Sequence, residues 1–249
     1  MRVINSRQNS LIQTFRNLAK DAEMRREKGC FLCDGYKTLT EAVRSSAEIQ
    51  TVLWKEKRKN GFPAFQEEYV LPSDLFDYVS PMKNSPGPLF TVKIRQNDYN
   101  SPVFGGVLVL EGVQDPGNVG TILRTADAFC IDTVILLDGC ADLYSPKTVR
   151  ASMGAIFRQN VLRLSTAELV DFCANYSLRL FGAALSDSAS DLRTTDLSHA
   201  AVAIGSEGKG LSSELRKLCD QEVIIPMSGA AESLNAAIAA SIIMWEMYR

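Results

Sequence analysis

The half of the chain from residue 101 onward alternates short apolar runs with amphipathic stretches, and this alternation constrains the fold most. Five apolar runs have the length and composition of buried strands: 107–111, 133–137, 179–184, 201–205 and 223–226. Five other stretches have helical spacing: 119–129, 145–157, 166–175, 211–218 and 233–248. Buried strands that alternate with helices predict an α/β fold, in which helices cover a mostly parallel sheet. Ligands of such sheets bind beyond the carboxyl ends of the strands.

The first 94 residues predict a second, smaller α/β arrangement. The predicted elements are helices over 8–28, 36–46 and 75–79 and strands over 30–33, 49–54 and 89–94. A polar segment, 94–103, contains Ser-Pro and separates the two regions. Because linkers have this composition, we predict one domain over 1–100 and another over 101–249.

The charge changes at the same place. Residues 1–100 carry 16 basic and 12 acidic side chains, whereas residues 101–249 carry 11 and 17. A basic N-terminal face indicates contact with RNA or DNA, although a solvated surface explains the same charges equally well. The side chains that we expect to contact RNA in this region are Arg25, Arg26 and Lys28.

Composition and single residues exclude several classes of protein. Hydrophobic residues make up 46% and charged residues 22%, typical of a folded globular protein. No apolar run is long enough for a membrane span and the first ten residues hold no signal-peptide core, so we expect a cytoplasmic protein. Cys30 and Cys33 lack the second cysteine pair of a zinc site, and the six cysteines resemble reduced, buried thiols. With His199 as the single histidine, we expect neither a multi-histidine metal site nor imidazole chemistry. No metal is predicted.

Polar and basic side chains follow the first two strands of the second region. Asn118 is placed to cap the helix 119–129, and Arg124 follows one to two turns later. A helix N-terminus with a nearby arginine suits a phosphate, but a capped helix with an ion-paired arginine is an equal alternative. Ser145 and Pro146 predict another helix start. In that helix Lys147 and Arg150 share one face, which serves either solubility or phosphate contacts.

Glycines follow the strand that ends at residue 205. The segment Ile204-Gly-Ser-Glu-Gly-Lys-Gly-Leu-Ser212 fits neither the P-loop nor the Gly-x-Gly-x-x-Gly pattern. A phosphate-hydrolysing site and the usual dinucleotide fold are therefore disfavoured. The residues themselves predict a small-molecule site built from the loops 205–210, 225–229 and 232–235, and lead no further.

Taken together, these segments resemble the three motifs of the SpoU (TrmH-like) RNA 2′-O-ribose methyltransferases of the SPOUT superfamily. Asn118-Val-Gly-Thr-Ile-Leu-Arg124 is similar to the first motif and Ser145-Pro-Lys-Thr-Val-Arg-Ala-Ser-Met-Gly154 to the second. The third motif is represented by Gly205-Ser-Glu-Gly, Ile225-Pro-Met and Ser233-Leu-Asn235. Residues 1–98 resemble, more loosely, the ribosomal-protein-like α/β domain that binds substrate in such enzymes, although Asp34 stands where many relatives have glutamate.

The resemblance implies an S-adenosylmethionine-dependent enzyme that methylates a ribose 2′-hydroxyl and releases S-adenosylhomocysteine. It also implies a deep trefoil knot in the second domain and a homodimer with a shared active site. The residues that it assigns to the cofactor are Ala184, Gly205, Ser206, Gly208, Gly210, Ile225, Pro226, Met227 and Leu234. The residues that it assigns to catalysis are Asn118, Arg124, Glu207, Ser233 and Asn235.

Arginine keeps its proton at neutral pH, so we expect Arg124 to stabilise the developing alkoxide while RNA phosphate or water takes the proton. Ribosomal RNA is favoured as substrate over transfer RNA by the additional N-terminal domain, which is an argument from family analogy. The alternatives are a tRNA 2′-O-methyltransferase and a non-catalytic RNA-binding or ribosome assembly protein on the same fold. A Rossmann-type methyltransferase for small molecules is disfavoured because the acidic-Gly-x-Gly motif is missing.

Overall fold

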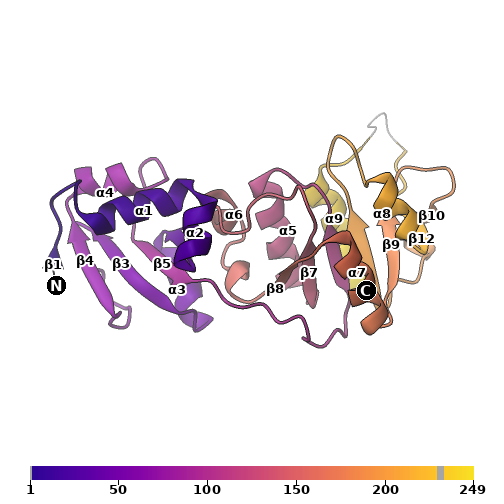
Figure 1. Cartoon of the computed structure of the whole chain (residues 1–249), viewed down its shortest axis with the longest axis horizontal. Coiled ribbons are helices and arrows are strands. Elements are labelled where there is room, and N and C mark those ends of the chain that lie inside the picture. The colour runs from indigo at the N-terminus through magenta and orange to yellow at the C-terminus, as the bar shows by residue number, and fades with distance from the viewer. Residues whose placement is uncertain (1, 229–232) are drawn as a thin grey trace. The chain divides into compact units, whose positions relative to one another are not determined.

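The computed structural model describes residues 2–228 and 233–249, which divide into two compact units. The N-terminal unit comprises residues up to 96 together with 142–157, and the C-terminal unit comprises 97–141 together with 158–249 (Figure 1). The domain boundary predicted near residue 100 stays a prediction. The segment with the second predicted motif groups with the N-terminal unit, which the linear sequence did not indicate.

The N-terminal unit is built on a five-stranded mixed sheet in the order β1-β4-β3-β5-β2. Its strands are β1 Arg2–Val3, β2 Cys30–Asp34, β3 Ile49–Lys55, β4 Glu67–Leu71 and β5 Leu89–Lys93. Its helices are α1 Ser10–Lys20, α2 Ala22–Lys28, α3 Tyr36–Arg44, α4 Ser73–Val79 and α6 Pro146–Ala151, with a 3-10 turn η1 over Ala155–Phe157. Strand β5 runs antiparallel to both of its neighbours, β2 and β3. Strand β4 runs parallel to both of its neighbours, β1 and β3.

Alternating side chains of this sheet face two separate cores. Leu32 and Leu53 pack with residues of α1 and α4, including Phe15 and Phe76. The neighbouring residues on the same strands point to the other face, where they pack with α3, Val149 of α6 and Phe157. Because a strand presents successive side chains to opposite faces, helices cover both sides of the sheet.

The prediction of one continuous helix over 8–28 is wrong, because the structure has two helices there, α1 and α2. Two helices meet at Asp21, whose backbone is extended and whose carboxylate accepts hydrogen bonds from Glu23 N at 2.8 Å and Met24 N at 3.3 Å. Aspartate at this position satisfies the free N–H groups that begin a new helix, and so stabilises the break. Strand β4, which lies between β1 and β3, was not predicted, because its sequence begins with two glutamates.

The C-terminal unit contains a seven-stranded sheet in the order β10-β12-β9-β11-β6-β7-β8, with every pair of neighbours parallel. Its strands are β6 Val107–Leu110, β7 Thr133–Leu136, β8 Asn160–Arg163, β9 Arg179–Ala183, β10 Ser190–Asp191, β11 Ala200–Ile204 and β12 Gln221–Ile224. Its helices are α5 Pro116–Ala128, α7 Thr166–Asn175, α8 Ser213–Leu218 and α9 Ala236–Tyr248, with a 3-10 turn η2 over Leu192–Thr194. The predicted α/β fold with a mostly parallel sheet is confirmed.

Helices cover this sheet as well. Leu169 and Phe172 of α7 and Leu215 of α8 pack in one buried cluster with the side chains of β6, β7, β9 and β11. Helix α9 lies against α5 and β11. All seven strands point in one direction, so their carboxyl ends meet at a single edge of the sheet. The trefoil knot stays a prediction.

Several helix boundaries differ from prediction, and three of them have a cause in the local sequence. Asp115, not Asn118, caps α5: its carboxylate accepts from Asn118 N at 3.0 Å, and Pro116 takes the first helical position, where its missing N–H costs nothing. Helix α6 ends at Ala151 because Gly154 follows with φ +97°, a conformation that glycine adopts readily. Helix α9 begins after Asn235, which caps it, rather than at residue 233.

No helix among residues 2–228 and 233–249 is long and apolar enough to cross a membrane.

Candidate functional site

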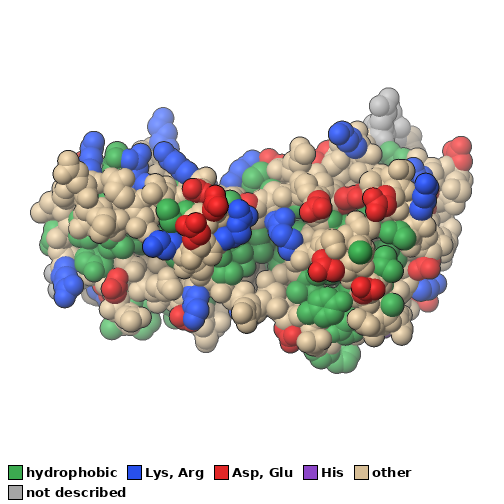
Figure 2. Space-filling model, in the orientation of Figure 1, with side chains coloured by type: hydrophobic (Ala, Val, Ile, Leu, Met, Phe, Trp, Pro, Cys, Tyr) green, Lys and Arg blue, Asp and Glu red, His purple; other side chains and the backbone are tan. Residues whose placement is uncertain are grey.

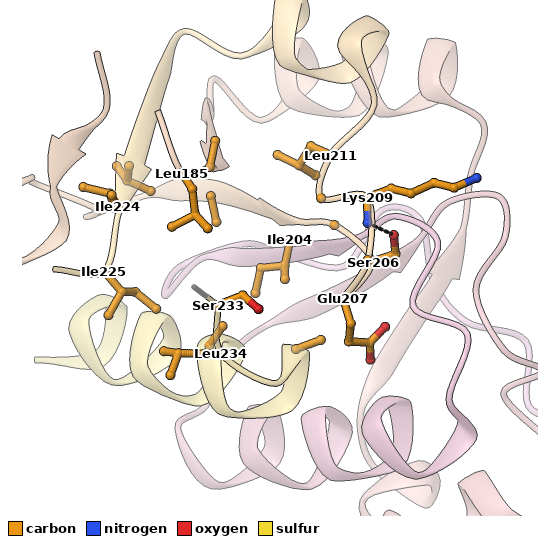
Figure 3. A pocket seen from close by; sticks show the side chains of 18 of the residues that line it. Leu185, Ile204, Ser206, Glu207, Lys209, Leu211, Ile224, Ile225, Ser233 and Leu234 are labelled. Carbon is orange, nitrogen blue, oxygen red and sulfur yellow. Dashed lines mark hydrogen bonds between the residues drawn. The ribbon is translucent and has the colours of Figure 1, made fainter. Parts of the chain in front are cut away.

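A pocket of about 580 Å³ lies at the carboxyl ends of β9, β11 and β12, within the C-terminal unit (Figure 3). Its walls come from the segments 183–185, 204–211 and 223–227, and the first residues of α9 close it. The volume falls within the range of pockets that hold drug-sized molecules. Sequence reasoning placed a small-molecule site in these loops. Residues 229 and 232 of the predicted loops lie outside the described residues.

The loop after β11 folds back tightly on itself. Gly210 N donates to Ser206 O at 2.9 Å, and Lys209 N donates to Ser206 Oγ at 3.3 Å. A Cβ at Gly205 would stand 2.0 Å from the carbonyl carbon of Gly210 and 2.2 Å from Leu211 N, which is impossible without moving the backbone. Glycine at 205 is therefore required by a close approach of two backbone segments. At Gly208 an added Cβ would meet nothing within 4 Å.

The pocket has an apolar interior and a polar rim. Leu185, Ile204, Ile225 and Leu234 line it, and in Figure 3 the side chain of Lys209 extends away from it. Such a surface suits a flat apolar group, while backbone N–H and C=O groups at the strand ends provide directional hydrogen bonds. No buried side-chain nitrogen or oxygen among the described residues lacks a hydrogen-bond partner.

An ion pair forms another part of the rim. Arg216 Nε donates to Glu222 Oε1 at 2.6 Å, and Glu222 also accepts from the hydroxyl of Ser186. The Arg216 guanidinium and the Ser186 hydroxyl hold the pKa of Glu222 below its usual value, and Glu222 in turn raises the pKa of Arg216. Glu222 thus neutralises Arg216, a cation that lines the pocket.

Three polar residues from distant parts of the chain form a hydrogen-bonded series beside the pocket. Asn118 Nδ2 donates to Glu207 Oε1, and Asn235 Nδ2 donates to Asn118 Oδ1 at 3.2 Å. Asn235 Oδ1 accepts from Ala237 N at 2.9 Å and Ile238 N at 3.3 Å at the start of α9. The first motif is thereby joined to two pieces of the third.

The orientation of both amides follows from chemistry. An ionised carboxylate only accepts, so the NH2 group of Asn118 must face Glu207 and its oxygen must face Asn235. Asn235 must then donate to that oxygen, which leaves its own oxygen for the helix N–H groups. One charge at Glu207 therefore fixes the direction of every hydrogen bond in the series.

Helix α5 carries Arg124 on its exposed side. Arg124 lies six residues beyond Asn118, about 9 Å along the axis at about 1.5 Å per residue. Its side chain is exposed and has no hydrogen bond or ion pair with any residue in 2–228 or 233–249. The predicted alternative of an ion-paired structural arginine therefore has no support within the described part of the chain.

The structure gathers most of the predicted cofactor residues around one pocket. Those that line it are Ala184, Gly205, Ser206, Gly208, Gly210, Ile225, Met227 and Leu234. Pro226 is exposed and is not part of the lining. Of the predicted catalytic residues, Glu207 and Ser233 also line the pocket. Their roles stay predictions.

The predicted RNA contacts belong to the N-terminal unit and divide into two groups. Arg26, Lys28, Lys147 and Arg150 are exposed. Arg25 is only 4% exposed, and its guanidinium pairs with Asp142 and donates to Leu18 O at 2.5 Å. Because these internal partners take its donors, Arg25 anchors the segment of the second motif, and we do not include it in a surface for RNA.

Several lining residues were missed by sequence reasoning. They include Leu185, Ile204, Leu211, Ile224, Ala236 and Ala239. Their common signal is position, since most follow or end a strand at the carboxyl edge. Apolar side chains there look like ordinary core residues until the neighbouring strands are known.

The thiols show no sign of activation. Burial, with the Asp220 carboxylate nearby, raises the pKa of Cys173 to about 11, and burial with Glu222 and Asp220 raises the pKa of Cys219 to about 12. Burial also raises the pKa values of Cys30 and Cys33. These thiols are protonated at neutral pH.

His199 is exposed at the entrance of β11, and a ring nitrogen lies 2.9 Å from Tyr176 O.

The fold and the pocket define a class: a parallel α/β domain that binds a small molecule at the carboxyl edge of its sheet. Comparison with known proteins identifies the family. The model of the SpoU rRNA methylase family matches residues 106–245, and the chain belongs to this family.

Several relatives match almost the whole chain, among them an uncharacterized tRNA/rRNA methyltransferase of Synechocystis that is 31% identical over 99% of this chain and 93% of its own length. A 23S rRNA guanosine 2′-O-methyltransferase of Bacillus subtilis is 31% identical over 99% of both chains. A 23S rRNA uridine 2′-O-methyltransferase of Streptomyces viridochromogenes is 32% identical over 100% of this chain and 92% of its own length. Among solved structures, the AdoMet-bound rRNA methyltransferase of Sinorhizobium meliloti superposes with a TM-score of 0.87 and 26% identity, covering 99% of this chain and 97% of that one.

Proposed function

We propose that this chain transfers a methyl group from S-adenosylmethionine to a ribose 2′-hydroxyl of ribosomal RNA. The observation that carries the proposal is the series Glu207–Asn118–Asn235, which joins the first and third motifs at the edge of the pocket. Membership of the SpoU rRNA methylase family supports the same reaction. A fold retained only for binding RNA would have no need for this hydrogen-bonded alignment.

The pocket fits S-adenosylmethionine in size and chemistry. Its apolar walls at Ile204, Ile225 and Leu234 suit the adenine, and Gly205 leaves the backbone of two loops close enough to provide hydrogen bonds. Bound there, this cofactor supplies a methyl group that is already activated on a sulfonium. The remaining task of the protein is to orient the ribose and stabilise the oxygen that attacks.

Arg124 is the cation available for that oxygen. Its guanidinium holds its proton at neutral pH, so it donates hydrogen bonds to the developing 2′-alkoxide while an RNA phosphate or water accepts the proton. Asn118 links Glu207 to Asn235 and so holds the two pieces of the third motif together, and Ser233 lies at the pocket wall. Orientation of this kind supplies about 7–11 kcal/mol of barrier reduction in favourable cases.

Ribosomal RNA is favoured as the substrate because the similarity extends over the N-terminal unit. Of three relatives that cover nearly all of this chain, two are named for 23S rRNA, one for guanosine and one for uridine, and the third is named for tRNA/rRNA. In Figure 2 lysines and arginines are spread over the N-terminal unit, while acidic side chains gather on the C-terminal unit. Arg26, Lys28, Lys147 and Arg150 are exposed cations that suit RNA phosphates. Such a substrate implies a cytoplasmic protein.

A homodimer forms through the outer face of α9. Ile238, Trp245 and Tyr248 are 53%, 49% and 58% exposed, although they are large and apolar. Phe129 at the end of α5 packs with Trp245 and with Tyr248, each at 5.6 Å between ring centroids. An apolar face of this kind on a folded protein indicates an interface. Arg124 lies on the same helix as this edge, so a partner subunit seated here shares the active site.

The test uses RNA from a strain that lacks the gene. Separated ribosomal and transfer RNA are incubated with the protein and labelled S-adenosylmethionine, digested, and analysed for 2′-O-methyl nucleosides. We expect label in ribosomal RNA and none with Arg124→Ala. Label confined to transfer RNA would contradict the choice of substrate. Absence of label from both RNAs and from assembled ribosomal particles, with the cofactor bound, would favour a non-catalytic RNA-binding protein.

A further inference from the structure

The loop that joins β3 to β4 in the N-terminal unit carries both aromatic rings and unpaired cations. Over residues 55–62 the sequence is Lys-Glu-Lys-Arg-Lys-Asn-Gly-Phe. Tyr36, the first residue of α3, stacks with Phe62 of this loop at 6.2 Å between ring centroids and an interplanar angle of 26°. The ammonium of Lys59 lies 4.2 Å from the centre of the Tyr36 ring. None of these residues belongs to the site described above.

A partly buried ion pair holds this loop in one shape. Arg58 Nε donates to Glu68 Oε2 at 2.8 Å, and Arg58 Nη2 donates to the carbonyls of Phe62 at 2.9 Å and Pro63 at 2.7 Å. Glu68 also accepts from Trp54 Nε1 and from Phe65 N, each at 2.8 Å. A mobile surface loop does not need internal hydrogen bonds of this number, so the outer side chains are presented on a fixed backbone.

The outer cations have no acidic partner. Lys37, Lys57 and Lys59 are exposed and form no ion pair with any described residue. Glu68 is paired with Arg58, whereas Glu56 is exposed and accepts from Ser73 Oγ at 2.5 Å, so it keeps its negative charge. The three unpaired lysines outnumber Glu56, so this surface keeps a net positive charge.

Rings beside unpaired lysines are the recognition elements of unstacked RNA nucleotides, whose bases stack on aromatic side chains and whose phosphates bind cations. We propose that Tyr36 and Phe62 with Lys57 and Lys59 form a surface that holds a single-stranded loop or bulge of the RNA substrate. This proposal rests on the proposed function and names a part of its substrate-binding surface. Lys59 covers the ring in the free protein, but an exposed cation–π contact is weaker than base stacking. An arriving base displaces the ammonium, which then meets a phosphate.

The experiment measures binding of protein-free 23S rRNA from a strain without the gene, and its methylation, by the full-length protein with S-adenosylmethionine. In Lys57→Gln/Lys59→Gln we expect the slope of log Kd against log salt to fall by about 1.4, about 0.7 for each phosphate contact. The control, Lys93→Gln/Lys217→Gln, removes the same charge from exposed sites outside the loop and leaves the slope unchanged. We expect Tyr36→Leu to weaken binding about tenfold and Tyr36→Phe to preserve it, because phenylalanine keeps the stacking face.

The outcomes separate the two proposals. If the wild-type protein methylates the RNA but the loop variants bind it as the control variant does, the proposed RNA-binding surface is wrong and the proposed enzymatic function stands. If the loop variants bind protein-free RNA normally but bind assembled ribosomal subunits more weakly, the surface contacts a ribosomal protein, and the proposed RNA contact is wrong. Failure of the wild-type protein to methylate any ribosomal RNA overturns the proposed function, and this inference with it.

Discussion

The two units of this chain are both α/β sandwiches, yet they place their polar chemistry differently. In the N-terminal unit β5 runs against its neighbours, so the carboxyl ends of the strands are divided between two edges. In the C-terminal unit all seven strands are parallel and three of them end at the pocket. The N-terminal unit also holds ion pairs that are at least partly buried, Arg25–Asp142 and Arg58–Glu68. Strand direction, more than composition, decides where a small-molecule site can form.

The largest effect is expected from substitution of Arg124, which should lower the catalytic rate of the C-terminal unit without changing its affinity for the cofactor. Arg124→Ala should lower kcat about 100- to 1000-fold, the usual cost of one electrostatic donor to a developing oxyanion. Cofactor affinity, measured by calorimetry, should stay within twofold. Arg124→Lys keeps the charge but loses the paired donors and should recover only part of the rate. Near wild-type turnover of that variant would contradict the bidentate role.

Gly205→Ala tests whether the close approach of two loops makes the pocket. The added methyl would clash with the backbone of Gly210, and displacement of the loop by about 1 Å should weaken cofactor binding about 100-fold. Gly208→Ala, in the same loop with open space around it, should change affinity less than threefold. Equal affinities of the two variants would show that the backbone contact is unimportant.

Asp142→Asn tests the ion pair inside the N-terminal unit. The substitution leaves the buried guanidinium of Arg25 without its charged partner. We expect a loss of about 2–3 kcal/mol in the free energy of unfolding, less than for a fully buried pair since Asp142 is 33% exposed. Urea denaturation measures it. Asp77→Asn, which breaks the more exposed pair with Lys55, should cost less than about 1 kcal/mol. Similar losses in both variants would refute the special role of Arg25.

Trp245→Glu tests the apolar face of α9. A charge in the centre of an interface should raise the dissociation constant of the dimer about 30-fold or more, as truncation of a tryptophan anchor does. Light scattering over a dilution series measures the mass. Leu218→Glu makes the same kind of change at a leucine of α8 that is 42% exposed and should leave the mass unchanged. A monomeric wild-type protein would end this proposal.

The smallest effect concerns the pH dependence of the N-terminal unit. Burial raises the pKa of Glu68, but the Phe65 N–H, the Trp54 indole and the Arg58 guanidinium outweigh it and hold the pKa below the ordinary 4.5. A lowered pKa in the folded state adds stability above the unfolded value, and this stability is lost as the pH falls through the folded pKa. Glu68→Gln should cost about 1–2 kcal/mol at pH 7, and the difference should shrink below about pH 4.5.

Asp34, in the same unit, should change stability with pH in the direction opposite to Glu68. Burial raises its pKa against the hydrogen bonds from Ser85 and Ser80. Its ionised form is therefore disfavoured by folding, so its contribution to stability increases as the pH falls through its folded pKa. Asp34→Asn should remove this acid-side gain. A pH profile of unfolding that is identical in both variants and wild type would contradict the assigned shifts.

The local pattern of the sequence was sufficient for the main elements. Predicted strands 107–111 and 133–137 end within one residue of β6 and β7, because uninterrupted apolar runs of this length have few other structures. The motif residues also led to the correct edge of the sheet. Strands β1, β4, β8 and β10 were missed, since β1 and β10 have only two residues each and β4 and β8 begin with polar residues.

Tertiary structure alone decided which polar residues meet. Asn118 binds residues 89 and 117 positions away, and Arg25 finds Asp142 across 117 positions. The sequence predicted Arg25 as an RNA contact because a basic residue on a basic helix is normally solvated. Periodicity reports which face of an element is apolar, but a hydrogen bond depends on how distant elements are packed. The amino-acid sequence therefore determined the family, the sheet and the edge that holds the pocket, whereas only folding decided the partners of its charged groups.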